Sequence, residues 1–278
     1  MLLLRPHLDY GLRSRAWKIP KGKLLRILVT NDDGIHAPGL VVAEAIARSL
    51  TDDVWVIAPE TEQSGASHSL TLALPLRLRS IGPKRFAVSG TPTDCVMMAC
   101  AEVMKDAPPT LILSGVNRGA NMADDVTYSG TIAGAMEGCA LGIPSVALSL
   151  EHHGDVKWDC PRVHAPAILR RLVEIGWPEG VLINVNFPDC APSEVKSIEF
   201  AAQGERDLQT AQLERRVDAR GYPYYWIGFR RVLSTAPAGT DLYAVADNRI
   251  AITPLHLNLT EHRVMAEMKA KLGSMPLS

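Results

Sequence analysis

The chain has 278 residues, of which 47% are hydrophobic and 21% are charged, and its formal net charge is −1 at pH 7. These values are typical of a globular protein with a substantial core, built as one large domain or as one domain with an appendage. The near-zero charge gives no sign of a nucleic-acid-binding surface, and no segment is apolar over the length needed to span a bilayer. The five cysteines show no CxxC spacing, which favours reduced thiols and a cytoplasmic protein.

The first 24 residues differ in character from the rest of the chain. A short apolar run at residues 2–4 precedes several basic residues. A signal peptide has the reverse order and a longer apolar region. We therefore expect residues 1–24 to form a poorly ordered N-terminal extension.

Residues 25–150 alternate between two kinds of pattern. Short apolar runs bounded by turn residues predict strands, and apolar residues at helical spacing predict helices. This alternation predicts an α/β fold with a doubly wound parallel sheet. We expect strands at 25–30, 54–58, 72–79, 85–88, 111–113 and 145–150, and helices at 38–50, 92–104 and 130–141.

Beyond residue 150 the pattern is looser. We expect a core over 25–200, which includes a helix at 163–175 and a strand at 181–187, and a C-terminal excursion over 201–278. The excursion begins with a polar loop and contains aromatic residues that could serve either an oligomer interface or ordinary sheet packing. Its expected elements are a loop at 203–221, strands at 222–229 and 250–255, and an amphipathic helix at 259–272.

Polar residues follow three of the expected strands at the points where those strands end. Asp32 and Asp33 follow the first strand, the loop with Ser64 follows the second, and the segment with Asn117 follows the strand at 111–113. In a parallel sheet these three loops emerge at one edge. Two carboxylates, a hydroxyl and an amide oxygen suit Mg²⁺ or Mn²⁺, although each loop alone is also consistent with plain turn chemistry.

The segment Ser129-Gly130-Thr131 opens the helix expected at 130–141. Two hydroxyls, a glycine that allows close backbone approach, and the free N–H groups of a helix start are typical of a phosphate site. An ordinary serine N-cap would account for Ser129 alone. Gly134 and Gly138 are better explained by close packing of the helix on the sheet. The chain has no GxGxxG, GxxxxGK[ST] or GxSxG motif, which excludes three common site types.

Several of these motifs together resemble those of the SurE (stationary-phase survival protein) nucleotidases. The resemblance covers roughly residues 25–265, and residues 1–24 have no counterpart. It implies a Rossmann-like core, a metal-dependent phosphatase of nucleoside 5′- and 3′-monophosphates, and dimers or tetramers with exchanged C-terminal elements. It also implies a metal held by Asp32, Asp33, Ser64 and Asn117. The motifs lie at 31–39, 64–67, 90–95, 114–117, 128–131, 239–241 and 252–255.

We interpret the chain as an α/β phosphohydrolase with one divalent metal ion, Mg²⁺ or Mn²⁺, per subunit. Asp32 and Asp33 are the expected catalytic residues, with Asp32 as general base or nucleophile. Two alternatives remain open at this point. One is a phosphoacceptor signalling domain, which also places paired acids after its first strand, and the other is a nucleotide-binding module without catalysis. The residues expected to hold the phosphate are Asn121, Ser129, Gly130 and Thr131.

Overall fold

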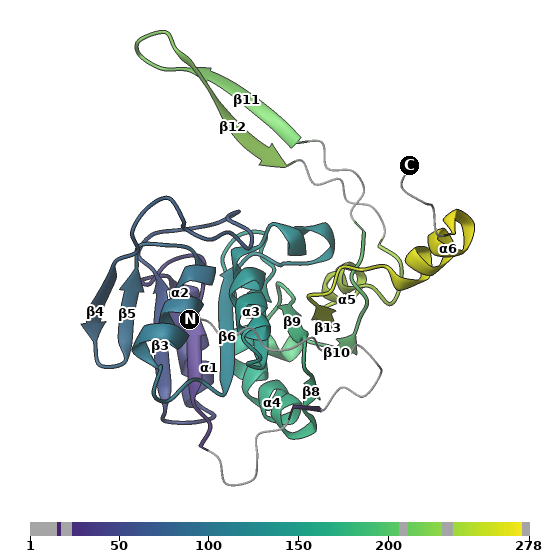
Figure 1. Ribbon diagram of the computed structural model, residues 1–278, viewed down its shortest axis with the longest axis horizontal. Helices are drawn as coiled ribbons and strands as arrows, with labels where there is room; N and C mark the ends of the chain where they lie inside the picture. Colours follow the sequence, from purple (N-terminus) through teal and green to yellow (C-terminus); the bar gives the residue numbers. More distant parts are fainter. Residues whose placement is uncertain (1–15, 18–23, 206–210, 230–235, 274–278) are drawn as a thin grey trace.

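A mostly parallel β-sheet forms the centre of the protein in the computed structural model, which describes residues 16–17, 24–205, 211–229 and 236–273 (Figure 1). The strands of this sheet are β2 (Ile27–Thr30), β3 (Val54–Pro59), β4 (Leu78–Gly82), β5 (Arg85–Val88), β6 (Leu111–Arg118), β7 (Ser145–Leu150), β9 (Val181–Phe187), β10 (Ser197–Phe200) and β13 (Arg249–His256). They lie in the order β10-β13-β9-β7-β6-β2-β3-β5-β4. The antiparallel neighbours in this sheet are β13 with β9 and β4 with β5.

Helices cover both faces of the sheet, as the alternating pattern predicts. Helices α1 (Pro38–Arg48) and α4 (Asp159–Ile175) share one core cluster with Val29, whereas α2 (Pro92–Met98) shares another with Leu28. Successive residues of a strand point to opposite faces, so these two clusters lie on opposite sides of β2. Helix α3 (Gly130–Ala140) packs beside α2. The expected α/β class with a mostly parallel sheet is confirmed.

The remaining elements are short or lie outside the central sheet. Helix α2 continues into a wider π-helical turn, η1, so the helix expected at 92–104 is confirmed with a change of type. The expected helix at 163–175 begins four residues earlier, and the one expected at 259–272 begins three residues later. The short elements and those outside the central sheet are η1 (Ala99–Val103), η2 (Ala123–Thr127), η3 (Pro192–Glu194), α5 (Asp241–Ala246), α6 (His262–Leu272), β1 (Ala16–Trp17), β8 (Trp177–Pro178), β11 (Ala211–Val217) and β12 (Pro223–Phe229).

A small part of the N-terminal region is described. Strand β1 pairs antiparallel with β8, and the rings of Trp17 and Trp177 lie 5.5 Å apart between centroids. Aromatic rings at this distance make a favourable contact. The expectation of poor order for residues 1–24 falls largely on residues 1–15 and 18–23, which lie outside the described residues.

The strand expected at 72–79 is wrong for most of its length. Strand β4 begins only at Leu78, and Leu72 and Leu74 are 87% and 71% exposed in an irregular segment. The alternation of leucines resembles a half-buried strand, but Leu72 and Leu74 pair with no strand in the described part of the chain. Pro75 lies in the same segment and cannot donate a ladder hydrogen bond.

The polar loop expected at 203–221 is also wrong in part. Strand β11 pairs antiparallel with β12, and the two form a hairpin that projects away from the body of the molecule (Figure 1). At its tip, Asp218 Oδ1 accepts hydrogen bonds from the backbone N–H groups of Arg220 and Tyr222, and Gly221 has a φ of +86°. A hairpin that covers no core needs no apolar face, so the polar sequence of β11 gave no strand signal.

The C-terminal region contributes directly to the central sheet. Strand β13 lies between β9 and β10, so part of the segment after residue 200 completes the core. Helix α6 lies farther out, away from the sheet (Figure 1). Within the described part of the chain, no helix is both long and apolar enough to cross a bilayer.

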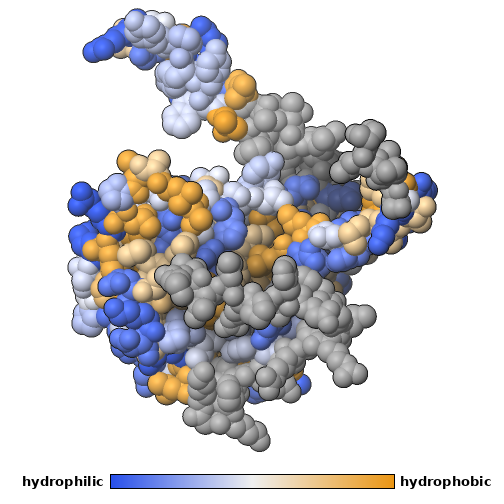
Figure 2. Space-filling view, in the orientation of Figure 1, coloured by the Kyte–Doolittle hydropathy of each residue, from blue (hydrophilic) through white to orange (hydrophobic). Residues whose placement is uncertain are grey.

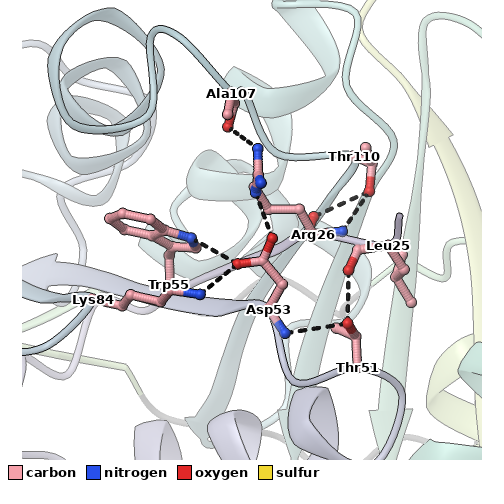
Figure 3. Close-up of polar contacts among 8 residues, drawn as sticks. All are labelled: Leu25, Arg26, Thr51, Asp53, Trp55, Lys84, Ala107 and Thr110. Carbon is pink, nitrogen blue, oxygen red and sulfur yellow. Dashed lines mark hydrogen bonds and ion pairs between the residues drawn. The ribbon is translucent and has the colours of Figure 1, made fainter. Parts of the chain in front are cut away.

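A polar network ties together the starts of β2 and β3 (Figure 3). The Asp53 carboxylate accepts hydrogen bonds from Arg26 Nε at 2.7 Å, Lys84 Nζ at 2.7 Å and the Trp55 indole at 3.1 Å. Arg26 also donates to the Ala107 carbonyl. Burial by itself would raise the pKa of Asp53, but the hydrogen bonds from Lys84, Arg26 and Trp55 together lower it.

We expect Asp53→Asn to lower the free energy of unfolding by about 2–3 kcal/mol at pH 7, because hydrogen bonds to a charged group are lost. A carboxylate whose pKa is lowered by folding adds stability above its unfolded pKa, and this stability is lost as pH falls through the folded pKa. The difference in free energy of unfolding between the wild type and Asp53→Asn should therefore be largest above pH 3.8, the ordinary pKa of an aspartate, and should shrink as pH falls below that value. Urea unfolding over a pH series measures both effects.

The matched control is Asp52→Asn, which removes the exposed neighbouring carboxylate and should change stability by less than about 0.5 kcal/mol. A difference for Asp53→Asn that stays constant down to pH 2.5 would contradict the electrostatic explanation.

Candidate functional site

The site begins where β2 ends, at Asn31, Asp32 and Asp33. Asn31 Nδ2 donates to the carbonyl of Gly34 at 3.0 Å, which closes a tight turn directly after the strand. Gly34 has a φ of +101°, a conformation that favours glycine. The turn therefore leaves both carboxylates at the carboxyl edge of the sheet, where ligands bind in folds of this kind.

Hydrogen bonds join the loops that follow β2 and β3. The Gln63 N–H donates to the Asp32 carbonyl at 2.8 Å, and the Ile35 N–H donates to the Pro59 carbonyl at 2.8 Å. Ser64 is next to Gln63 in this loop and is exposed, with its hydroxyl donating to Glu62 Oε1 at 2.9 Å. The loop that carries Ser64 is thus held against the residue that carries the first carboxylate.

The end of β6 joins the same group. The Arg118 N–H donates to Asp33 Oδ2 at 3.3 Å, which places Asn117 beside the second carboxylate. The short strand expected at 111–113 is wrong in its length, because pairing with β7 resumes at Asn117 after a register shift that follows Ser114. Gly115 and the polar residues of this stretch resemble a turn in sequence, so Asn117 lies on a strand and not in a loop. Asn117 Nδ2 donates to the Gly119 carbonyl at 2.9 Å.

The start of α3 lies against Asp32. Ser129 is the N-cap, and its hydroxyl accepts the Ile132 N–H at 3.0 Å. The Thr131 hydroxyl donates to Asp32 Oδ1 at 2.5 Å. A Cβ added at Gly130 would lie only 2.7 Å from Asp32 Cβ and 2.9 Å from its Oδ2. Gly130 is therefore the residue that allows the helix start to approach the carboxylate.

The loop with Ser64 is also anchored to the segment that precedes α3. The Ser67 hydroxyl donates to the Thr127 carbonyl at 2.7 Å, and His68 Nε2 lies 3.0 Å from Glu137 Oε2 on α3. Gly134 and Gly138 serve packing, as expected, because an added Cβ would meet Ser114 and Ser145 respectively. The three predicted loops and the predicted phosphate helix thus meet at one place.

Two carboxylates are held close together in a poorly solvated position. Asp32 is 4% exposed. Burial raises its pKa to about 6, with a smaller increase from the Asp33 charge, while the hydrogen bond from Thr131 opposes the shift. Burial also raises the pKa of Asp33, as does the charge of Glu62, while the backbone N–H and the positive charge of Arg118 oppose the increase. Among the described residues, no Lys, Arg or His forms an ion pair with either carboxylate.

This pair of carboxylates fits a hard divalent cation. A buried acid beside a second, half-buried acid is destabilised when no ion pair neutralises either of them, and a bound cation would compensate both charges. Ser64 and Asn117 add neutral oxygens of the kind that Mg²⁺ and Mn²⁺ accept. In the described parts of the chain, no group of three or more His, Cys, Asp or Glu side chains is placed to hold a metal, so a metal here depends on this oxygen set.

Asn121 lies in a buried asparagine network. Its Nδ2 donates to Ser149 Oγ at 2.8 Å, and its N–H donates to Asn186 Oδ1 at 2.8 Å. Its carbonyl accepts hydrogen bonds from Asn184 and Asn186. These partners come from β7 and β9, so the network fixes the chain between β6 and α3 on the neighbouring strands.

Two residues that sequence analysis did not assign to the site support it from the C-terminal side. The Asp241 carboxylate is fully buried and accepts the Ala123 N–H at 3.0 Å, while Gln203 Nε2 donates to the Ala123 carbonyl at 2.9 Å. Ala123 has a φ of +51°, which is unfavourable without such support. Asp241 belongs to a motif quoted in the sequence analysis, Gly-Thr-Asp at 239–241, which was the available signal.

Comparison with known proteins gives consistent results. A family model described as "Survival protein SurE" matches residues 27–210. A curated protein named "5′-nucleotidase SurE" from Parvibaculum lavamentivorans is 56% identical over 257 residues, covering 91% of this chain and 93% of that protein. A protein of the same name from Brucella suis is 57% identical over 254 residues, covering 90% of this chain and 99% of its own length.

A solved structure agrees with the sequence comparisons. The crystal structure of the SurE protein from Aquifex aeolicus has a TM-score of 0.78 and 37% identity, and covers 89% of this chain and 99% of its own. The family model extends over all the loops that meet at Asp32. The chain belongs to the SurE family.

Proposed function

We propose that this chain is a 5′-nucleotidase that removes phosphate from nucleoside 5′- and 3′-monophosphates with the help of one divalent metal ion. The observation that carries the proposal is the pair Asp32 and Asp33, two carboxylates that form no ion pair among the described residues, beside the start of α3. The names of the curated relatives support the same reaction.

Asp32, Asp33, Ser64 and Asn117 would hold the metal, which is Mg²⁺ or Mn²⁺ in our proposal. When bound, such an ion polarises a phosphoryl oxygen and lowers the pKa of a water molecule. The Thr131 hydroxyl fixes Oδ1 of Asp32. Oδ2 of Asp32 would then take a proton from the water that attacks phosphorus, so that Asp32 acts as general base and not as nucleophile in our proposal.

The start of α3 would bind the phosphate. The backbone N–H groups at Gly130 and Thr131 lie at the positive end of the helix dipole, where anions are stabilised. The Thr131 N–H also acts on the Asp32 carboxylate, so the Gly130 N–H is the main proposed backbone donor to the phosphate. The Ser129 hydroxyl accepts a hydrogen bond as N-cap and still has its own proton to donate. Asn121 is the fourth proposed phosphate residue, held rigidly by its contacts with Ser149 and Asn186.

The two alternatives are less well supported. A phosphoacceptor domain needs an aspartate after a central strand, and Asn117 occupies that position at the end of β6. A binding module without catalysis would not be expected to share 57% identity with a protein named as a nucleotidase. We also propose a cytoplasmic location, which agrees with the finding that none of the five cysteines forms a disulfide bond.

The experiment that tests the proposed function is a panel of metals against phosphate esters, measured by phosphate release. Nucleoside monophosphates should be hydrolysed repeatedly with Mg²⁺ or Mn²⁺ and not after chelation. Asn117→Ala should raise the Mn²⁺ concentration for half-maximal rate about 10-fold or more, because a metal contact is lost. Release of a single phosphate per chain would favour the phosphoacceptor alternative, and no release would favour the binding module.

We further propose that the chain forms a homodimer or homotetramer through its C-terminal region. Figure 2 shows apolar residues at the surface of the body on the side of α2 and β5, which lies outside the C-terminal region. Large apolar side chains are also exposed on β10, the hairpin and α6, which a monomer leaves in water. They are Ile198, Phe200, Leu213, Tyr225, Trp226, Ile227, Met265 and Met268.

We expect the full chain to form at least a dimer at micromolar concentration, as measured by light scattering after size exclusion. A chain that ends at Leu257 lacks α6 and should give smaller species or insoluble protein. A soluble and active monomer of the full chain would contradict this proposal.

A further inference from the structure

A cavity of about 540 Å³ opens beside Asp33, the second carboxylate of the site. Asp33, Ser64 and Arg118 line it, which connects it directly to the site described above. His152 and Trp158, from the segment between β7 and α4, line it as well. Its volume is in the range of small-molecule sites, and it is larger than a phosphate group alone requires.

Trp158 is an aromatic residue that packs against the main core, where its side chain is partly buried. Its Cη2 lies 3.0 Å from the position that a Cβ of Gly39 would take. The same Cβ would lie 1.9 Å from the Val116 carbonyl oxygen. Gly39 therefore allows α1 to approach β6 and leaves space for the indole, which contributes an apolar wall to the cavity.

Polar groups complete the lining. The ring atom Nδ1 of His152 is buried and has no hydrogen-bond partner among the described residues. A buried polar nitrogen without a partner is costly, and a ligand in the cavity can supply one. Arg118 has an exposed side chain, and its backbone N–H is the group bonded to Asp33, so its guanidinium is available to a ligand.

We propose that this cavity holds the nucleoside part of the substrate, with the base stacked on Trp158 and a polar edge of the nucleoside bonded to His152. This inference rests on the proposed function, since it places the phosphate of the same molecule beside Asp32. A planar base gains from stacking on an indole, whereas an aliphatic phosphate ester does not. Purines overlap the ring more than pyrimidines do, so the cavity favours purine nucleotides.

The test compares Trp158→Ala with Trp158→Phe. The measured quantity is kcat/KM for adenosine 5′-monophosphate divided by kcat/KM for glycerol 2-phosphate, which has no aromatic ring. Trp158→Ala should lower this ratio about 5- to 150-fold, the usual effect of losing one base–aromatic stack. Trp158→Phe should restore most of it, and the loss should appear mainly in KM for the nucleotide.

Trp55→Phe is the matched control. Trp55 lies beside Asp53 at the start of β3, whereas the site lies where the strands end, so this replacement should leave the ratio unchanged. Calorimetric binding of adenosine 5′-monophosphate to the wild type and to Trp158→Ala gives a readout independent of turnover. Equal loss for both esters, or an unchanged ratio together with unchanged binding, would overturn the assignment of Trp158. Absence of turnover in the wild type would refute the proposed function, and the binding comparison would still decide the role of Trp158.

Discussion

Asp32→Asn and Asp33→Asn are each expected to remove most of the phosphohydrolase activity while the fold is kept. Asparagine has the same shape, and the Thr131 hydroxyl can still donate to Oδ1 at position 32. Loss of a charged ligand should weaken Mn²⁺ binding by about 10- to 100-fold or more. The rate as a function of Mn²⁺ concentration measures this effect.

The stability of the metal-free variants separates loss of chemistry from loss of fold. Asp32 is buried and has a raised pKa, so its charged form is unfavourable in the metal-free protein at neutral pH. Asp32→Asn should therefore leave the metal-free protein at least as stable as the wild type, and should reduce the increase in Tm that Mn²⁺ produces. Asp52→Asn, an exposed acid outside the site, is the control. Wild-type turnover of both variants at limiting Mn²⁺ would show that the metal site is misassigned.

The sequence predicted the central strands because they are buried on both faces. Strands β7 and β9 have the expected limits 145–150 and 181–187. A strand covered by helices on both sides is largely apolar, which gives a signal that does not depend on its neighbours. Strand β5 also has its expected limits, 85–88, although it is only half-buried. The site was predictable for a related reason, since the carboxyl ends of parallel strands lie at one edge.

The sequence pattern was misleading in segments that are not covered on both faces by other elements. The leucines at 72 and 74 alternate as in a strand but lie exposed, and the polar strand β11 pairs only with β12. In both cases the outcome depends on whether a partner strand is near, and local sequence does not contain this information. Strand β6 was cut short for another reason, because its glycine and polar residues are those of a turn.

Residues that act through contacts between distant parts of the chain were the hardest to predict from the sequence. Asp241 reaches Ala123 across 118 positions of sequence, and Trp158 meets the cavity only because Gly39 leaves space for it. Neither residue is next to a strand end, where the candidate metal-binding residues were predicted. Their positions follow from the packing of whole elements, which no local pattern encodes.

Gly130→Val is expected to lower turnover by at least about 100-fold, equivalent to about 2.7 kcal/mol in the transition state, and to weaken Mn²⁺ binding as well. The sequence alone attributes Gly130 to the close approach of a phosphate. In the structure, an added Cβ would lie 2.7 Å from Asp32 Cβ and 2.9 Å from its Oδ2. A side chain at this position must therefore displace the carboxylate or the helix start. Turnover and Mn²⁺ titration by calorimetry measure the two effects separately.

Gly134→Ala is the matched control, because it lies one turn farther along α3. Its added Cβ would be 2.8 Å from Ser114 Oγ and 3.1 Å from Thr30 Cγ2, so it disturbs the packing of the same helix without meeting Asp32. Gly134→Ala should lower Tm and leave Mn²⁺ affinity within about threefold of the wild type, whereas Gly130→Val should change both. If Gly130→Val lost turnover with normal Mn²⁺ affinity, the phosphate and not Asp32 would be the group that needs the glycine. Normal turnover of Gly130→Val would refute the placement of this helix start in the active site.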